Sequence, residues 1–372
     1  MTTDPIGLYV HIPFCVRKCN YCDFCSFPDN AQLRENYVAA LITEIESYKA
    51  TPRIKIDTVF FGGGTPSLLS VEQFAAIVNA IRKSFYLCED LEFTVEVNPG
   101  TVNEEIMSAF KDSGVNRISI GFQSMHDNEQ KKLGRIHNYD DFYEAFALAR
   151  RLGFDNINVD VMYGIPEQTL NSFEQTLLAV TDLSPEHISC YGLIIEEGTP
   201  FHDAIDTLEL PDEDTECMMY EQASRLLRKK GYEHYEISNY SKRGKQCRHN
   251  LKYWHDEDYI GVGLAAHSYY RGARVYNTES FDADIGKTRA EYQYSERTPG
   301  KDAFEYVMLA LRLSEGLSLI KYEGIFGISF LRGRERILDK YEKLGLLEVT
   351  KASVRLTEKG FYLSNTIISE LV

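Results

Sequence analysis

The chain has 372 residues, which is more than one hydrophobic core normally serves, so we expect two or more packed regions. With 56 acidic and 40 basic residues the net charge is −16, and this balance argues against a nucleic-acid-binding protein, which needs a basic surface. No apolar run reaches the roughly 18 residues of a membrane span, and no secretory signal segment stands out, so we expect a cytoplasmic protein.

Up to Phe201, short β-rich runs alternate with longer amphipathic segments. Strands are predicted at Leu8–Ile12, Thr58–Gly62, Glu92–Val97, Arg117–Gly121, Asn156–Met162 and His187–Leu193. Helices are predicted at Ala31–Lys49, Val71–Phe85, Glu104–Asp112, Tyr139–Leu152 and Leu170–Leu183. This alternation predicts an α/β fold of parallel strands joined by crossover helices, and six units favour a partial (β/α)6 barrel over a complete eight-stranded one. In such folds the chemistry lies at the carboxyl ends of the strands.

Beyond Phe201 the pattern changes. A helix is predicted at Glu216–Lys230, and an aromatic stretch from Tyr232 to Tyr276 contains the only tryptophan. Residues Glu279–Gly300 are polar and predict a loop, and helices followed by a small hairpin then resemble a winged helix, for which the acidic charge favours packing or a lid over DNA binding. We therefore expect a barrel core at 1–236, an aromatic-rich connecting segment at 237–300 and a smaller, mainly helical winged-helix-like domain at 301–372.

Cysteines cluster directly after the first predicted strand. Cys15, Cys19 and Cys22 have the spacing C-x3-C-x2-C, and Cys25 follows. Thiolates are soft ligands for iron–sulfur clusters, zinc and Cu(I). Three ligands leave one corner of a [4Fe–4S] cube free, and this spacing resembles that of radical S-adenosylmethionine (SAM) enzymes, in which SAM caps the fourth iron. Zinc sites usually use two separated ligand pairs, and disulfides are rare in the cytosol, so both are weaker alternatives. Cys25 is left open as a spare thiol, a cluster-assembly aid or an extra ligand.

Two further strand ends carry polar groups. Gly62–Ser67 is a glycine-rich run whose exposed N–H groups can receive a carboxylate, which favours a site for the amino and carboxylate groups of SAM. Glu96 ends the third strand, and its place at the barrel mouth favours a ligand contact over a surface ion pair.

The fourth and fifth strands end in polar residues as well. A buried Gln123 needs a hydrogen-bonding partner, and Arg135 suits bidentate binding of a carboxylate. His137 is read as a capping or core histidine. Asp160 lies inside an apolar strand and also needs a partner, which a ribose hydroxyl would supply.

These motifs together resemble the oxygen-independent coproporphyrinogen III oxidase family of radical-SAM proteins over nearly the full chain. The segments that carry the resemblance are Tyr9–Cys15 with the cysteine spacing, Gly62–Ser67, Glu96, Gln123, Leu133–His137 and Asp160–Pro166. The resemblance implies that Cys15, Cys19 and Cys22 bind the cluster. It also implies that SAM is contacted by Tyr9, Gly63, Gly64, Thr65, Glu96, Gln123, Arg135 and Asp160.

Three features resemble the HemW haem chaperone branch of that family more than its dehydrogenases. The dehydrogenases carry their extra cysteine where this chain has Phe24, and they have a longer segment before the cluster cysteines. Arg248–Trp254 resembles the H-N-x-x-Y-W motif of HemW proteins, in which His249 could ligate haem iron, with His267 a weaker candidate. Alternatively, His249 caps a turn and its aromatic neighbours pack in the core.

The expected activity is that of a radical-SAM haem chaperone, with a [4Fe–4S] cluster and SAM as cofactors and haem as cargo. The resemblance implies SAM cleavage and transfer of haem to an acceptor such as a respiratory protein. It leaves open a homodimer and peripheral membrane contact. The alternative activity is oxidative decarboxylation of two coproporphyrinogen III propionates to vinyl groups, and a third possibility is a non-catalytic cluster or zinc protein.

Overall fold

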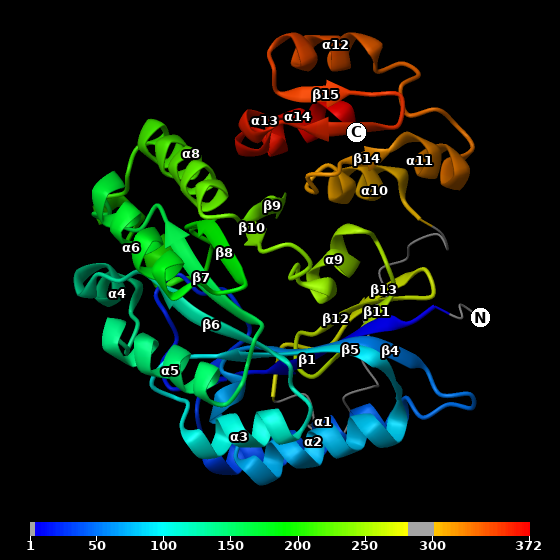
Figure 1. Ribbon diagram of the computed structural model, residues 1–372. Helices are drawn as coiled ribbons and strands as arrows, with labels where there is room; N and C mark the ends of the chain where they lie inside the picture. Colours follow the sequence, from blue (N-terminus) through cyan, green and yellow to red (C-terminus); the bar gives the residue numbers. More distant parts are fainter. Residues whose placement is uncertain (1–3, 282–300) are drawn as a thin grey trace.

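The computed structural model describes residues 4–281 and 301–372 (Figure 1). Within these residues the main body is an open sheet of 11 strands in the order β13-β12-β11-β1-β4-β5-β6-β7-β8-β10-β9. Its six central strands are parallel: β1 (Ile6–Ile12), β4 (Lys55–Gly63), β5 (Tyr86–Val97), β6 (Arg117–Gln123), β7 (Ile157–Tyr163) and β8 (His187–Gly192). The predicted partial barrel of six parallel strands is therefore confirmed.

Helices follow the central strands and cover the outer face of the curved sheet (Figure 1). The long ones are α1 (Ala31–Ser47), α2 (Val71–Ser84), α3 (Glu104–Asp112), α5 (Tyr139–Arg151), α6 (Leu170–Leu183) and α8 (Glu213–Lys229), and two short ones are α4 (Asp127–Leu133) and α7 (Pro200–Asp203). With the exception of α4, these helices begin at a residue whose side chain accepts a hydrogen bond from the first turn. Ser70 and Asn138, for example, each form a capping box with the residue three positions later.

The main core lies between the sheet and these helices. Phe74 of α2 packs against Phe61 of β4 and Phe110 of α3, with ring centroids 5.1 and 4.6 Å apart. All three rings are fully buried, and each such ring contributes about 1.5–3 kcal/mol relative to an exposed one. The opposite face of the central strands is thereby held rigid and carries the polar residues described below.

The edges of the sheet come from the segment predicted to connect the domains. β11 (Tyr259–Val262) pairs in parallel with β1, and β12 (His267–Tyr270) and β13 (Ala273–Tyr276) continue that edge. At the other edge β10 (Asn239–Ser241) lies antiparallel to β8, followed by β9 (Glu233–Glu236). Between these edges runs α9 (Arg248–Trp254). Most of the predicted polar loop at 279–300 lies outside the described residues.

The C-terminal region is mainly helical, as predicted. It contains α10 (Ala303–Ala310), β14 (Leu317–Ser318), α11 (Leu319–Phe326), α12 (Glu335–Lys343), β15 (Leu347–Val349), β16 (Ser353–Leu356), α13 (Glu358–Tyr362) and α14 (Ser364–Leu371). The three strands form a small separate sheet, and Tyr322, Leu338 and Val354 are among the residues of a second hydrophobic core. Across residues 4–281 and 301–372, none of the helices combines the length and apolar character needed to cross a bilayer.

Candidate cluster and SAM site

The three cysteines of the C-x3-C-x2-C motif lie in a loop whose two ends are fixed. The short strand β2 (Phe14–Cys15) pairs in parallel with β3 (Phe27–Pro28), which closes the loop at its base. Near its middle, the Asn20 backbone N–H donates to Leu133 O at 2.9 Å, which ties the loop to the end of α4. The loop is thereby held over the carboxyl ends of β1 and β4.

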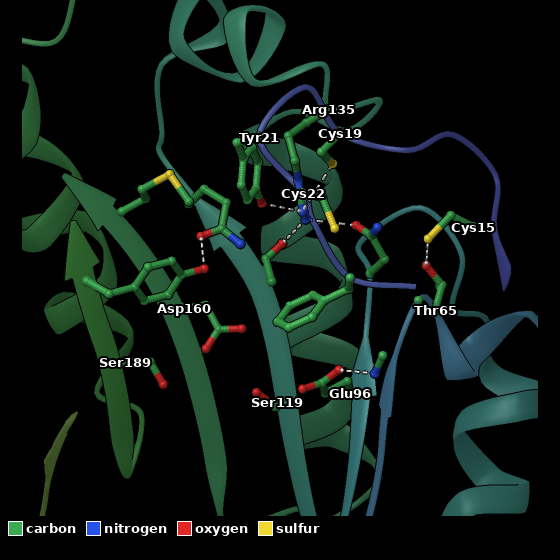
Figure 2. Close-up of a pocket in the computed structure, with 18 of the residues that line it drawn as sticks. Cys15, Cys19, Tyr21, Cys22, Thr65, Glu96, Ser119, Arg135, Asp160 and Ser189 are labelled. Carbon is green, nitrogen blue, oxygen red and sulfur yellow. Dashed lines mark hydrogen bonds between the residues drawn. The ribbon is translucent and has the colours of Figure 1, made fainter. Parts of the chain in front are cut away.

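The thiols are half-buried and are free in this structure. Burial raises the pKa of Cys15, and it raises the pKa of Cys22 to about 11 although the Phe24 backbone offers a hydrogen bond. The Thr65 hydroxyl donates to Cys15 Sγ at 3.7 Å, and Arg135 lies 3.9 Å from Cys19 Sγ (Figure 2). These neighbours are donors that favour a thiolate over a thiol, and thiolates are the form that ligates iron.

The glycine run after β4 packs against the base of the cysteine loop. A side chain at Gly64 would place its Cβ 2.6 Å from Phe14 O, and one at Gly63 would meet the His11 ring at 2.3 Å. Gly63 also has a φ of +107°, which only glycine adopts readily. The end of β4 therefore requires glycines because it lies so close to the segment from His11 to Phe14, in addition to any contact that the glycines make with a ligand.

Two carboxylates face each other across the mouth of the barrel. Glu96 Oε2 accepts a hydrogen bond from Gly63 N at 3.1 Å, and burial, together with repulsion from Asp160, raises the pKa of Glu96 to about 8 (Figure 2). Asp160 accepts from Asn158 Nδ2 at 2.7 Å, and burial raises its pKa as well. Burial disfavours the ionised form of both carboxyls, and a cationic or hydroxyl-bearing ligand would stabilise that form again.

Arg135 brings positive charge between the cysteine loop and the strands. Its Nη2 donates to Asn98 Oδ1 at 2.9 Å and to Gly121 O at 2.6 Å, and its Nη1 reaches the Tyr21 hydroxyl at 3.4 Å. Its Nε is buried without a partner. The guanidinium is thus fixed in place beside the cysteine loop.

Gln123 ends β6 in a strained conformation. Its φ is +76°, in the left-handed region that residues with a Cβ seldom adopt, and its Oε1 accepts from the Tyr191 hydroxyl at 3.0 Å. Strain of this kind costs on the order of 1–3 kcal/mol and is found mainly at functional sites. The turn directs the Gln123 side chain toward the same cavity.

A single cavity of about 500 Å³ brings these residues together. It is lined by Cys15, Cys19, Cys22, Gly63, Gly64, Thr65, Glu96, Gln123, Arg135 and Asp160, together with others (Figure 2). Of the predicted residues, Tyr9 is not in this lining, and its hydroxyl lies 3.0 Å from His11 Nδ1. Three thiols beside a guanidinium suit a thiolate-bound [4Fe–4S] cluster, and the two acids and the Arg135 guanidinium suit a ligand that carries an ammonium, a carboxylate and hydroxyl groups. Among the described residues, no group of three acidic, histidine or cysteine side chains is placed to hold a single metal ion. A single ion needs its ligands closer together than a four-iron cube does.

Comparison with known proteins places this site in a family. Residues 9–180 match the radical SAM superfamily and residues 298–363 match the HemN C-terminal domain. The chain is 36% identical to the heme chaperone HemW of Haemophilus influenzae, covering 98% of this chain and 97% of that protein. It is 35% identical to the heme chaperone HemW of Bacillus subtilis, covering 96% and 97%. The chain belongs to the HemW family of radical-SAM proteins.

Its fold matches a solved structure closely. Coproporphyrinogen III oxidase (HemN) from Escherichia coli, a radical SAM enzyme, superimposes with a TM-score of 0.84 at 22% identity, covering 99% of this chain and 90% of that one. At that level of identity the match establishes the shared fold. The shared fold includes both the barrel and the C-terminal domain of this chain.

The motif that resembles H-N-x-x-Y-W in HemW proteins forms α9, beneath the barrel mouth. His249 is 1% exposed, its Nδ1 lies 2.8 Å from Thr58 Oγ1, and its Nε2 lies 2.7 Å from the Tyr253 hydroxyl. Burial, with Lys252 and Arg117 nearby, lowers the pKa of His249 to about 3, so the ring is neutral. Both ring nitrogens are engaged, and iron could bind only after one of these partners left. His267, on β12, is exposed and stacks on Tyr276 with ring centroids 5.4 Å apart.

Several residues of this HemW-family site were not predicted from the sequence. Tyr21, Asn98, Ser119, Ser189 and Tyr191 also line the cavity. A usable signal existed for two of them, because Ser119 and Ser189 are polar residues at inward positions of β6 and β8, on either side of Asp160. Tyr21 lies between two of the cysteines, and only the folded loop reveals its contact with Arg135.

Proposed function

We propose that this protein is a haem chaperone of the radical-SAM type, which holds a [4Fe–4S] cluster and SAM in the cavity at the barrel mouth and delivers haem to an acceptor protein. The observation that carries the proposal is the convergence of Cys15, Cys19 and Cys22 with Arg135 and two raised-pKa carboxyls around one cavity. The HemW relatives, which align over nearly the whole chain, support the cargo and the delivery role.

The cysteine loop would hold the cluster through three thiolates. When bound, the cluster would supply one electron to the sulfonium group of SAM. Binding requires the thiols to lose their protons, and the positive charge of Arg135 beside Cys19 favours that loss. The pairing of β2 with β3 fixes the base of the loop, so the ligands do not have to be ordered at the moment of binding.

The remaining residues would orient SAM. Glu96 is placed to accept from its ammonium group, since an ammonium would return the carboxyl to its ionised form. The Arg135 guanidinium lines the cavity and its positive charge suits the carboxylate, and Asp160 would accept from a ribose hydroxyl. Gln123 and Tyr191, joined by a hydrogen bond, form the adjoining wall of the cavity.

Haem would bind through an axial histidine, and His249 is the residue that the motif favours. Its engagement with Tyr253 and Thr58 means that haem binding through this ring requires α9 to shift. The neutral state of the imidazole is the one that ligates iron.

Anaerobic reconstitution provides the test. We expect close to four irons and four sulfides per chain, tight SAM binding, and a haem Soret band that moves to an acceptor apoprotein on mixing. Coproporphyrinogen III should not be converted when SAM and a reductant are added. Substantial decarboxylation would instead identify the alternative dehydrogenase activity, and zinc in place of iron and sulfide would contradict both.

A further inference from the structure

Beneath the cavity, the interior of the barrel contains a hydrogen-bonded chain of polar residues that leads away from Asp160, and the proposed function uses none of its other members. It starts at Asp160, passes through Asn158, His187 and Tyr235, and ends at Cys247, the residue that precedes α9. Asn158, His187, Tyr235 and Cys247 are each 6% exposed or less. Burying polar groups costs desolvation free energy, and the hydrogen bonds between these residues offset that cost only while every member of the chain is paired.

The hydrogen bonds of this chain all point the same way. The Cys247 backbone N–H donates to the Tyr235 hydroxyl at 3.3 Å, which leaves the Tyr235 proton for His187 Nε2 at 2.8 Å. His187 Nδ1 must then carry its proton and donate to Asn158 Oδ1 at 2.6 Å. Each donor polarises the next, so a change at one end alters the strength of the bonds at the other.

At the upper end of the hydrogen-bonded chain, Asn158 contacts Asp160 and also one serine on each neighbouring strand, Ser119 on β6 and Ser189 on β8. Asn158 Nδ2 donates to Asp160 Oδ1 at 2.7 Å and to Ser119 Oγ at 2.8 Å, and Ser189 Oγ donates to Asn158 Oδ1 at 3.2 Å. Asp160, Ser119 and Ser189 all line the cavity. A ligand hydroxyl that donates to Asp160 therefore shares this carboxyl with the first bond of the chain and alters the strength of that bond.

The lower end holds the first turn of α9. Glu92, a buried acid on β5, accepts from Arg248 N and His249 N at 3.0 Å each, and from Cys247 Sγ at 3.7 Å. The negative charge of this carboxylate satisfies the free N–H groups at the start of the helix. Tyr235 and Glu92 thus bind the same three-residue segment from two sides.

Arg117 adds a fixed charge between the two ends. Arg117 lies on β6 and is 2% exposed. Burial alone would lower the pKa of its guanidinium, but the pKa is raised by four nearby groups: Cys247, Glu92, Tyr235 and Asp160. The cation therefore lies within electrostatic reach of both the cavity acid and the start of α9.

We propose that His187 and Tyr235 are positioning residues that couple occupancy of the cavity at Asp160 to the placement of α9, the helix that carries His249. The proposal deepens the proposed function and rests on it in one respect, that SAM is the ligand whose hydroxyl reaches Asp160. In functional terms, SAM binding would loosen or tighten α9 and so set whether the His249 ring is available to haem.

A double-mutant cycle tests the coupling without any ligand. Hydrogen exchange of the α9 amides is measured in Asp160→Ala, Tyr235→Phe and the double variant. One bond of this type corresponds to about a fivefold change in exchange, and we expect Asp160→Ala to produce it in the wild type but not in the Tyr235→Phe background. Should these variants not fold, two others replace them: Asp160→Asn removes the acid while keeping an acceptor for Asn158, and His187→Phe breaks the hydrogen-bonded chain at the residue next to Tyr235.

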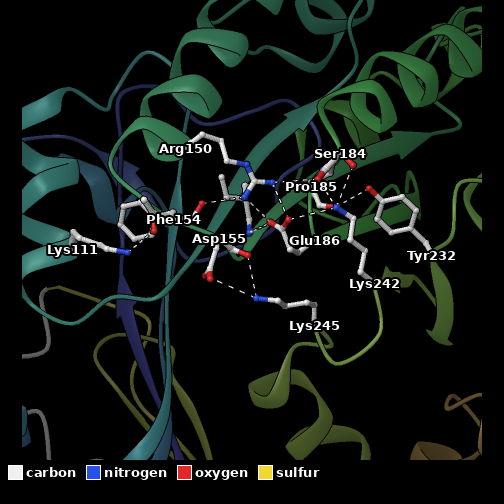
Figure 3. A network of polar contacts seen from close by, with 12 residues as sticks. Lys111, Arg150, Phe154, Asp155, Ser184, Pro185, Glu186, Tyr232, Lys242 and Lys245 are labelled. Atoms are coloured by element: carbon white, nitrogen blue, oxygen red, sulfur yellow. Dashed lines mark hydrogen bonds and ion pairs between the residues drawn. The ribbon is translucent and has the colours of Figure 1, made fainter.

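Tyr232→Phe is the matched control. Tyr232 is also a buried tyrosine, and its hydroxyl donates to Pro185 O at 2.7 Å at the opposite, amino-terminal end of the strands (Figure 3). The Tyr232→Phe substitution removes one buried hydrogen bond that is not part of the chain from Asp160 to Cys247. The effects of Asp160→Ala and Tyr232→Phe on exchange should therefore be additive. Independent, additive effects of Asp160→Ala and Tyr235→Phe would overturn the proposal, as would unchanged α9 exchange in Asp160→Ala.

The second arm adds SAM to the reconstituted protein at saturation. We expect α9 exchange to change in the wild type and in Tyr232→Phe and to stay constant in Tyr235→Phe. SAM that binds without any change in α9 would overturn the coupling and leave the proposed function standing. Failure of the wild type to bind SAM would overturn the proposed function, and the mutant cycle would still decide the coupling.

Discussion

The raised pKa of Glu96 should make the folded protein less stable as the pH rises, and Glu96→Gln should abolish this pH dependence. Burial raises that pKa from 4.5 to about 8, so the folded protein favours the neutral acid. The cost of ionising it is absent below pH 4.5, grows as the pH rises toward 8 and is constant above that value. Glutamine has the shape of the neutral acid and can still accept from Gly63 N.

The magnitude follows from the separation of the two pKa values. A shift of about 3.5 units corresponds to at most about 5 kcal/mol at 1.36 kcal/mol per unit. Glu96 is partly exposed to the open cavity, and part of its raised pKa comes from repulsion by Asp160, which is itself partly exposed. We therefore expect about half of this free energy, roughly 2–3 kcal/mol. The stability of Glu96→Gln relative to the wild type should therefore rise by this amount between pH 5 and pH 8.5.

Urea denaturation of the cluster-free protein at several pH values measures the effect. Glu129→Gln is the control, because that buried carboxylate accepts from Ser124 Oγ and from Gln168 Nε2 at 3.1 Å, so its loss should destabilise the protein at both pH values. An equal difference between Glu96→Gln and the wild type at pH 5 and pH 8.5 would refute the reasoning. Glu96→Gln should also bind SAM more weakly, because it removes the carboxylate that we propose as the partner of the SAM ammonium group.

Other predictions concern the cluster, the glycine turn and the haem motif. Cys15→Ala should abolish both the visible absorbance of the reconstituted cluster and SAM cleavage, and a variant that retained its iron would contradict the ligand assignment. Gly64→Ala forces a Cβ to 2.6 Å from Phe14 O, so it should lower the free energy of unfolding by about 1–3 kcal/mol, measured by urea denaturation, and reduce iron incorporation. Arg135→Lys keeps the charge but loses the planar set of donors, and it should weaken SAM binding at least tenfold by equilibrium dialysis. Tyr253→Phe removes the hydroxyl from His249 Nε2, so it should raise haem affinity up to about fivefold in a Soret titration, whereas His249→Ala should lower it; unchanged affinity in both would remove His249 as an axial ligand.

Local patterns were sufficient to predict the central barrel. Each of the six parallel strands was found within a few residues of its predicted bounds, because apolar runs between helical segments identify buried parallel strands. The largest error was β5, which starts at Tyr86, whereas the prediction began at Glu92. The extra residues are partly or fully exposed and include the charged Glu89 and Asp90. They are strand because Lys55 and Ile56 of β4 pair with Tyr86 and Leu87.

Long-range pairings explain what the sequence did not reveal. β11 joins β1 in parallel from about 250 residues away, and nothing near Tyr259 indicates that partner. The chain from Asp160 to Cys247 likewise joins β7, β8, β9 and α9, so it exists only once these elements are packed. The cysteine, glycine and acid motifs could be predicted because each lies in a short stretch at one strand end. The burial of His249 could not, since it depends on Thr58 and Phe60 of β4.

The attachment of the C-terminal region to β9 has a consequence for how the two parts of the chain can be separated. Ser314 N donates to Tyr235 O and Ile237 N donates to Arg312 O, both at 3.0 Å, and Glu236 forms a β-bridge with Leu313. Residues 312–314 therefore satisfy backbone groups that an edge strand would otherwise offer to other chains. Removing residues 301–372 would expose that edge and invite aggregation. A chimera that exchanges this region between relatives should keep residues 312–314 with the barrel against which they pair.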